Sequence, residues 1–142
     1  VGLVNAMIAV GIVSIPTYIR LVRGSVLSIK NREFVQAAKA IGVRESVIIF
    51  KHILPHCLAP IIVQSSLQIG VAILWAAGLG FLGLGAQAPT PEWGAMLSQG
   101  RGYIRTAHHV TTYPGIAIML SVLGFNLLGD GLRDALDPKM SD

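Results

Sequence analysis

Residues 57–80 read CLAPIIVQSSLQIGVAILWAAGLG, and this stretch decides the fold class because it contains no Asp, Glu, Lys or Arg. A helix that crosses a lipid bilayer needs about 20 mostly apolar residues. Residues 57–80 are therefore long enough to span a membrane as one helix, and the uncharged run continues beyond them to Pro91.

Two further uncharged runs, Val1–Ile19 and Thr106–Gly129, stand on either side of this stretch. Hydrophobic residues make up 53% of the chain and charged residues 13%, and the mean hydropathy is +0.66. Soluble domains typically carry about 25% charged residues, and their core helices are shorter and have a charged face. The sequence therefore predicts an all-α, polytopic membrane protein with about three transmembrane helices, the last from about Tyr113 to Leu132.

Basic residues are concentrated between the first two runs. Seven of the eleven Lys and Arg side chains lie there: Arg20, Arg23, Lys30, Arg32, Lys39, Arg44 and Lys51. Short cytoplasmic loops of membrane proteins carry such an excess of Lys and Arg. This rule predicts that residues 20–55 are cytoplasmic and residues 81–112 lie outside, and it explains the net charge of +4 without a nucleic-acid partner.

The segment 81–112 is predicted to be a re-entrant or surface-lying outer segment. Gly78–Gly85 holds too many glycines to favour a helix. Farther on, Pro91 can begin a short helix near Glu92–Ser98, with Thr90 as its cap. The only cysteine, Cys57, excludes an internal disulfide and is interpreted as a small packing residue.

Gln64 and Gln68 lie one helical turn apart within the second span. Polar side chains at such positions face protein or a water-filled path rather than lipid. The two glutamines are therefore candidates for a translocation path. Hydrogen bonding between helices explains them equally well, and the sequence leaves both explanations open.

The cytoplasmic loop reads REFVQAAKAIGVRESVIIFKHILP over residues 32–55. Asn31 can cap a helix that begins at Arg32 and ends at Gly42. The side chains expected on one face of this helix are Phe34, Ala37, Ala38 and Ile41. A second helix is predicted from about Arg44 to Leu54, ending at Pro55. Such a pair of helices can dock on another protein or rest on lipid headgroups.

The spacing in this loop resembles the signature loop of ABC importer permeases, the transmembrane subunits of binding-protein-dependent importers. The matching order is Gln36-Ala37-Ala38, three residues, Gly42, nine residues, and then His52-Ile53-Leu54-Pro55. Gln36 replaces the Glu of that signature, so a role that needs a negative charge there would fall to Glu33. His52 stands where the signature has Ile.

Three other segments resemble the C-type subunit of the dipeptide/oligopeptide/nickel branch of this family. They are FLGLG (81–85), PTPEWG (89–94) and NLLGDGLRD (126–134). The resemblance implies a MetI-like permease fold, with residues 1–142 as the C-terminal part of a single permease domain and residues 20–55 as its coupling loop. The residues that it implies for coupling to an ATPase are Glu33, Phe34, Gln36, Ala37, Ala38, Ile41, Gly42, Leu54 and Pro55.

The same resemblance implies the partners and the location. It implies cytoplasmic ABC ATPase subunits, a second permease subunit, an extracytoplasmic substrate-binding protein, and a multi-pass location in the inner (cytoplasmic) membrane. The substrate is expected to be a dipeptide or oligopeptide, and nickel or a glutathione-type molecule stays open. No cofactor is expected.

Enzymatic chemistry is not predicted for this chain. The sequence lacks a G-x-x-x-x-G-K-[ST] phosphate loop, so nucleotide would be bound by a partner. His52 and His56 have the spacing of two metal ligands on a helix, but no third ligand stands nearby, so no metal site is predicted. An ATP-independent channel or secondary transporter is the alternative class, and it would be expected to carry charged or acidic residues inside the spans. The three uncharged runs contain no Asp, Glu, Lys or Arg.

Overall fold

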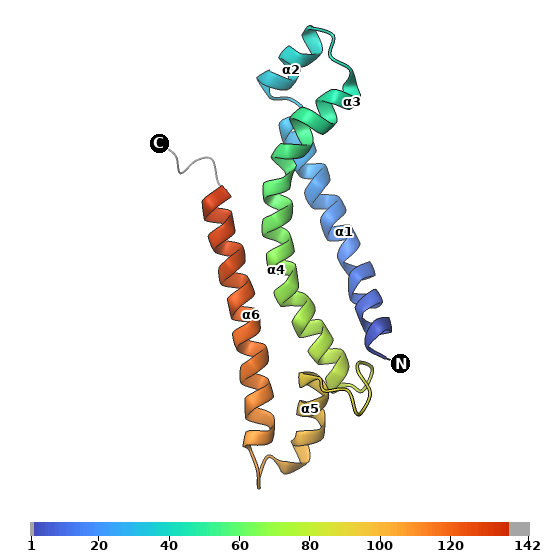
Figure 1. Cartoon of the computed structure of the whole chain (residues 1–142), viewed down its shortest axis with the longest axis vertical. Coiled ribbons are helices and arrows are strands. Elements are labelled where there is room, and N and C mark those ends of the chain that lie inside the picture. Colours follow the sequence, from blue (N-terminus) through green and yellow to red (C-terminus); the bar gives the residue numbers. More distant parts are fainter. Residues whose placement is uncertain (1, 137–142) are drawn as a thin grey trace. The chain divides into compact units, whose positions relative to one another are not determined.

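The computed structural model describes residues 2–136, and every regular element in that range is a helix. In chain order these are α1 (Leu3–Ile29), α2 (Glu33–Ala40), α3 (Glu45–Val47), the π-helix η1 (Ile48–Ile53), α4 (Leu54–Phe81), α5 (Trp93–Gly100), the 3-10 helix η2 (Arg101–Tyr103) and α6 (His109–Leu136) (Figure 1). The all-α prediction is therefore confirmed.

Three of the helical stretches are long and apolar enough to cross a membrane: Leu3–Ile29, Glu45–Phe81 and His109–Leu136. Within their most apolar windows only 6%, 17% and 11% of the residues are buried. Most of these side chains therefore need apolar surroundings outside the chain, as in a bilayer. The prediction of three transmembrane helices is confirmed.

The helices are longer than predicted at several ends. α1 continues to Ile29, so the first part of the predicted loop 20–55 is helical. α4 continues into the glycine-rich stretch as far as Phe81, since each glycine costs a long helix only about 1 kcal/mol relative to alanine. Gly83, with a φ of +76°, then follows the end of α4. The backbone N–H of Leu84 donates to the carbonyl of Leu79 at 2.8 Å, as in a glycine-terminated helix.

The chain divides into two compact units that each draw on several helices. Among the described residues, unit 1 contains residues 2–14 and 66–128, and unit 2 contains residues 15–65 and 129–136. Helices α1, α4 and α6 each contribute residues to both units. Each unit is described by itself below.

In unit 1, α4 and α6 approach closely at Gly70. A Cβ atom on Gly70 would lie 3.1 Å from Oδ1 of Asn126 and 3.5 Å from the carbonyl oxygen of Val122. Small residues let helix backbones come together in this way. Ser66, one turn before Gly70 in α4, is also small, and both residues are buried.

Unit 1 also holds α5 against the end of α4. Glu92 caps α5, because its carboxylate accepts hydrogen bonds from the N–H groups of Gly94 and Ala95, both at 2.8 Å. A short helix near Glu92–Ser98 is thus confirmed, but the expected cap at Thr90 is wrong. Glu92 has extended backbone geometry directly before the helix, which is the geometry of a cap, and its side chain reaches the free N–H groups.

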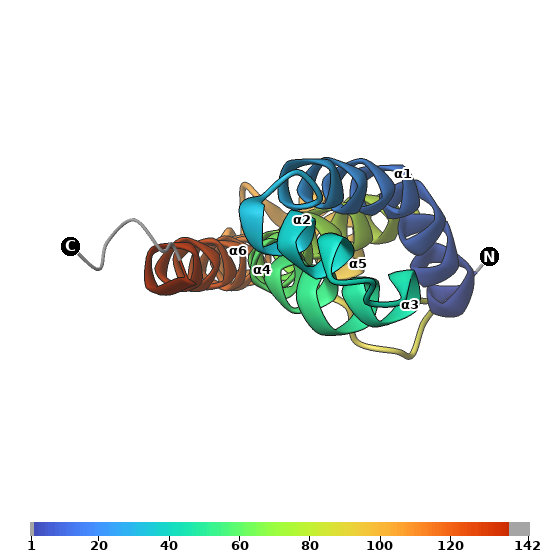
Figure 2. The ribbon, with the colours of Figure 1, turned by 90° about the horizontal axis from the view of Figure 1, so that it is seen from above.

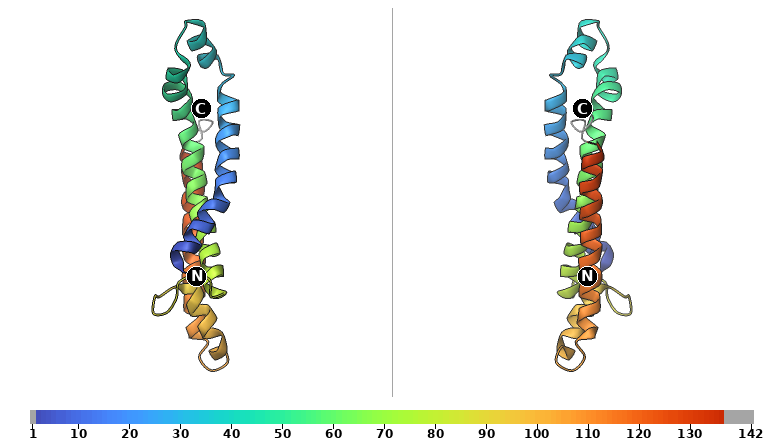
Figure 3. Two further views of the ribbon diagram at one scale, coloured as in Figure 1. Left: turned by 90° about the vertical axis from the view of Figure 1, so that its right-hand side faces the viewer. Right: turned by 90° about the vertical axis from the view of Figure 1, so that its left-hand side faces the viewer.

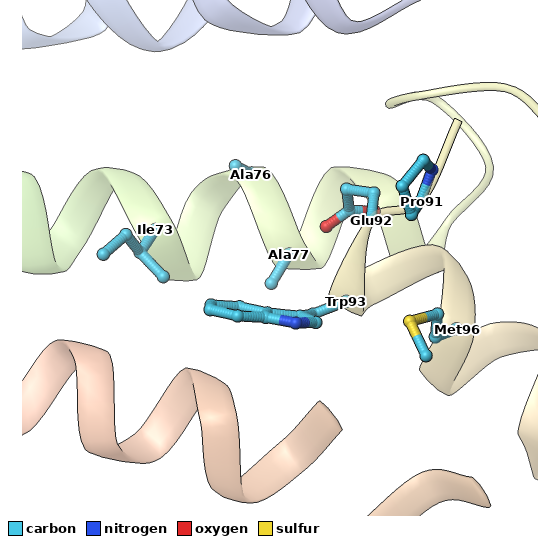
Figure 4. Close-up of a pocket in the computed structure, with 7 residues that line it drawn as sticks. All are labelled: Ile73, Ala76, Ala77, Pro91, Glu92, Trp93 and Met96. Atoms are coloured by element: carbon cyan, nitrogen blue, oxygen red, sulfur yellow. The ribbon is translucent and has the colours of Figure 1, made fainter. Parts of the chain in front are cut away.

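Glycines bring α5 and α4 together. A Cβ atom on Gly94 would collide with the carbonyl group of Ala77, and a Cβ atom on Gly80 would collide with the Glu92 carboxylate. Trp93 extends along α4 beneath Ile73 and Ala77 (Figure 4). The start of α5 is therefore packed on α4 without room for added side chains.

In unit 2, the later part of α1 and the first turns of α4 run side by side (Figure 3). The Tyr18 hydroxyl donates to Oγ of Ser65 at 3.1 Å, and Ser65 donates in turn to the carbonyl of Ile61 at 2.8 Å. Helices α2 and α3 lie beside each other in the connection between α1 and α4 (Figure 2). This connection is the segment that the sequence singles out as a functional loop.

Candidate functional site

The connection between α1 and α4 has a hydrophobic core of its own. Its buried members come from the end of α1, from α2, from η1 and from the start of α4: Ile29, Val35, Ala38, Ile48, Ile53 and Cys57. Val35 is 0% exposed, Cys57 is 1% exposed and Ile48 is 2% exposed. The loop is therefore a folded element held by packing, and Cys57 is the packing residue that the sequence predicts.

Helix α2 begins at Glu33, one residue later than predicted. Its N-cap is Arg32, which has extended backbone angles and makes no side-chain cap hydrogen bond. The predicted cap at Asn31 is therefore wrong. Asn31 stands one residue too early, whereas the Arg32 carbonyl accepts the first bonds, from the N–H groups of Val35 and Gln36 at 3.0 and 3.1 Å.

Gly42 terminates this helix as predicted. Its φ is +78°, the left-handed conformation that residues with a Cβ rarely adopt. The Gly42 N–H donates to the carbonyl of Lys39 at 3.0 Å, and the Val43 N–H donates to the carbonyl of Ala38 at 3.1 Å. These two bonds form a Schellman motif. Val43 then packs against the core of the loop.

The four side chains predicted to share one apolar face are divided between two surroundings. Ala38 is 7% exposed and lies with Val35 in the loop core, whereas Phe34 is 37% exposed and Ile41 is 80% exposed. Ala37 is exposed as well. The prediction of one shared face is wrong because Val35 and Ala38, three residues apart, are the pair that faces inward. We call Phe34, Ala37 and Ile41 the uncovered face of α2.

Phe34 also contacts the start of α4. Its ring centroid lies 5.2 Å from that of His56, with the planes tilted by 46°. This distance lies within the range of favourable ring contacts. This contact joins α2 to α4 at the side of the loop. The orientation of the uncovered face therefore depends on the Phe34–His56 contact as well as on the buried core.

The predicted stop at Pro55 is wrong, because the helix continues through Pro55 into α4. The six residues before Leu54 form a π-helix, and the Leu54 N–H donates to the carbonyl of Ile49, five residues earlier. A proline inside an α-helix clashes with the carbonyl of the preceding turn. The wider π-helical turn leaves room for the proline ring. Pro55 has no backbone N–H, so it leaves no donor unpaired at this position.

The remaining residues predicted for coupling lie on the surface of unit 2. Glu33 and Gln36 of α2 are exposed, and so are Leu54 and Pro55 at the start of α4. The structure thus places Gly42 at the turn, Ala38 in the core, and the other predicted residues at exposed positions of unit 2. The sequence analysis missed Val35, although its spacing from Ala38 was a usable signal.

Of the two candidate path residues, Gln68 hydrogen bonds between helices. Its Nε2 donates to Oγ of Ser14 in α1 at 2.9 Å, and Ser14 donates to the carbonyl of Val10 at 2.8 Å. Gln64 is half-buried. Within residues 2–136 no three His, Cys, Asp or Glu side chains are grouped so that they could hold a metal ion.

Comparison with known proteins identifies similar sequences along nearly the whole chain. Residues 2–142 match the family described as binding-protein-dependent transport system inner membrane component. The chain is 62% identical over 139 residues to the dipeptide transport system permease protein DppC of Alkalihalophilus pseudofirmus, covering 98% of this chain and 46% of that relative. It is 53% identical over 141 residues to the di/tripeptide transport system permease protein DppC of Pseudomonas aeruginosa, covering 99% of this chain and 46% of that relative.

A third relative carries a different substrate in its name. The chain is 53% identical over 139 residues to the glutathione transport system permease protein GsiD of Salmonella typhimurium, covering 98% of this chain and 46% of that relative. The chain therefore spans about half the length of the curated relatives it matches.

Proposed function

Because this chain belongs to the family of binding-protein-dependent transport system inner membrane components, we propose that it forms part of a permease subunit that imports peptides and is driven by a separate ATPase. The relatives named for dipeptides and for di- and tripeptides support the peptide substrate. Glutathione is the second candidate, supported by an equally covered relative. Uptake of a labelled dipeptide in competition with glutathione by the full-length subunit and its partners separates the two.

The uncovered face of α2 carries this proposal. Phe34, Ala37 and Ile41 are exposed on a helix that is itself fixed by Val35, Ala38 and the Gly42 turn. A rigid helix with an uncovered, partly apolar face is suited to insertion into a groove on another protein. The small side chain of Ala37 between two larger ones would let the backbone of α2 come close to that partner.

The partner that we propose for this face is a cytoplasmic ABC ATPase subunit. Glu33 and Gln36 stand at the rim of the face, and Leu54 and Pro55 extend the surface to the start of α4. A second permease subunit and an extracytoplasmic substrate-binding protein complete the proposed assembly. Gln64 and Gln68 remain candidates for the translocation path, and the bond of Gln68 to Ser14 gives Gln68 a second role in joining α1 to α4.

Orientation of the loop follows from charge. Residues 20–55 hold most of the basic side chains of the chain, and we propose that they face the cytoplasm. The segment 81–112, which contains α5 and η2, then belongs to the opposite side as an outer re-entrant or surface segment. Within this arrangement the ATPase meets α2, and the substrate-binding protein meets the other side of the membrane.

Replacing Ala37 with arginine in the full-length subunit tests the proposal. A buried, unpaired charge in the interface costs several kcal/mol, and about 1.4 kcal/mol is a tenfold change in affinity. We expect Ala37→Arg to lose ATPase co-purification and peptide uptake at a normal membrane level. Ser46→Arg, which adds the same charge on exposed α3, is the matched control and should keep both. Wild-type association and uptake with Ala37→Arg would leave α2 as a helix that rests on lipid.

A further inference from the structure

Arg20 and Arg23 lie one turn apart on α1 and have no acidic partner among residues 2–136. The Arg20 Nε donates to the carbonyl of Pro16 at 3.3 Å, and the exposed Arg23 side chain makes no hydrogen bond or ion pair with any of the described residues. Two guanidinium groups, three residues apart on one side of a helix, repel each other unless an anion lies near them. Such an anion would have to come from outside residues 2–136.

An apolar groove lies beside these arginines in unit 2. It has a volume of about 540 Å³ and is shallow and open, and its lining is Tyr18, Ile19, Val22, Arg23, Val26 and Leu27. Arg23 is the one charged side chain in this lining. The Tyr18 hydroxyl is already bonded to Ser65, so the lining offers a cation at one position and hydrocarbon along the rest.

The position of the arginines along α1 matches the surface of a bilayer. Leu3–Ile19 contains no charged residue. At a rise of about 1.5 Å per residue this part of the helix covers about 26 Å, close to the roughly 30 Å of a hydrocarbon core. Arg20 and Arg23 therefore follow at the level of lipid headgroups, where a guanidinium binds phosphate oxygens in pairs.

We propose that Arg23, with Arg20 beside it, binds the phosphate of an anionic phospholipid of the cytoplasmic leaflet, and that an acyl chain of this lipid runs toward the membrane interior along the part of the groove formed by Tyr18 and Ile19. Charge complementarity selects the ligand, because two cations without an acidic partner among residues 2–136 favour a lipid with a net negative charge over a zwitterionic one. The lining favours a lipid over free phosphate, because apart from Arg23 it consists of apolar side chains and a tyrosine whose hydroxyl is already bonded to Ser65. A free phosphate would therefore find no additional hydrogen-bond donors there. The inference rests on the cytoplasmic orientation of residues 20–55 and does not depend on the ATPase.

Native mass spectrometry of the full-length subunit tests the site. The subunit is purified from membranes, or from bilayers of phosphatidylcholine mixed with phosphatidylglycerol, and the retained lipid is counted. We expect Arg20→Gln combined with Arg23→Gln to reduce retained phosphatidylglycerol about tenfold. Arg44→Gln combined with Lys51→Gln removes the same charge from exposed positions of the same loop and should keep retention within about twofold of wild type.

Four results would overturn the proposal. These are equal retention in the arginine double variant and the wild type, an equal loss in the control, no preference over phosphatidylcholine, and displacement of the lipid by inorganic phosphate alone. Arg23→Lys, which keeps the charge, should retain more lipid than Arg23→Gln, and this comparison remains informative if the double variant is unstable. Because lipid is counted without the ATPase, failure of the coupling proposal would leave this result unchanged.

Discussion

At the scale of single residues, Gly42 has the clearest effect on the loop. Its φ of +78° turns the chain from α2 toward α3, and no atom lies within 4 Å of the place a Cβ would take. A substitution there is therefore strained by backbone conformation and not by crowding. The strain would act on the turn whose hydrogen bonds to Lys39 and Ala38 close the helix.

We predict that Gly42→Ala loosens the core of the loop. The left-handed conformation costs a residue with a Cβ roughly 1–2 kcal/mol, which corresponds to a 5- to 30-fold change in a local equilibrium. Cys57, buried in this core, can report the opening if it is the only cysteine left in the full-length subunit. A small thiol reagent should label Cys57 roughly 5- to 30-fold faster in Gly42→Ala than in the wild type.

Gly24→Ala is the matched control for this measurement. Gly24 lies inside α1 with no positive φ and no atom within 4 Å of an added Cβ. Alanine is favoured over glycine at such a position by about 0.5–1 kcal/mol. The labelling of Cys57 should stay at or below the wild-type rate, and equal acceleration by both substitutions would contradict the role given to the Gly42 turn.

Residue roles differ in how far the sequence predicts them. Gly42 was predictable because a glycine directly after a periodic apolar segment is the usual end of a helix. The caps at Arg32 and Glu92 were not, because Asn31 and Thr90 are better cap residues by type. Which neighbour becomes the cap depends on where the backbone is extended, and that occurs at Arg32 and Glu92.

At the scale of elements, α5 and α4 are in close contact within unit 1. Gly94 sits against the carbonyl of Ala77, and the Glu92 carboxylate sits against Gly80 while it caps α5. The absence of two Cβ atoms allows both contacts. The short helix is therefore held at the end of α4 by backbone packing and by its cap.

We predict that Gly94→Ala displaces α5 and lowers the heat stability of the purified full-length subunit. Overpacking of this kind typically costs about 1–3 kcal/mol. Gly102→Ala, in η2 of the same segment, meets no atom within 4 Å and should leave heat stability unchanged. An unchanged midpoint for heat-induced aggregation with Gly94→Ala would contradict the packing described for α5.

The sequence predicts which segments are helical better than it predicts where each helix ends. The three apolar stretches predict three long helices, and the structure has them. Helix ends were less predictable, because proline and glycine signals are local and tertiary packing changes their effect. Pro55 lies inside a helix because η1 widens the turn before it, and a π-helical turn leaves no pattern in the residue types of Ile48–Ile53.

At the scale of the whole molecule, the apolar surface and the basic residues lie on different parts of the chain. The spans keep most of their side chains uncovered, while the basic residues gather in the last part of α1 and in the connection between α1 and α4. This connection has its own buried core and leaves one face of α2 uncovered. A membrane subunit that receives movement through a compact cytoplasmic element would have these features.

Photo-crosslinking from the uncovered face of α2 tests this account most directly. A photoreactive residue is placed at Ile41, which is 80% exposed, or at Gln99 of α5, in the full-length subunit assembled with its partners. We expect Ile41 to crosslink to the ATPase and Gln99 to give no ATPase adduct, because the two positions are proposed to lie on opposite sides of the membrane. Crosslinks from Ile41 to phospholipid alone, or an ATPase adduct from Gln99, would contradict the proposed coupling.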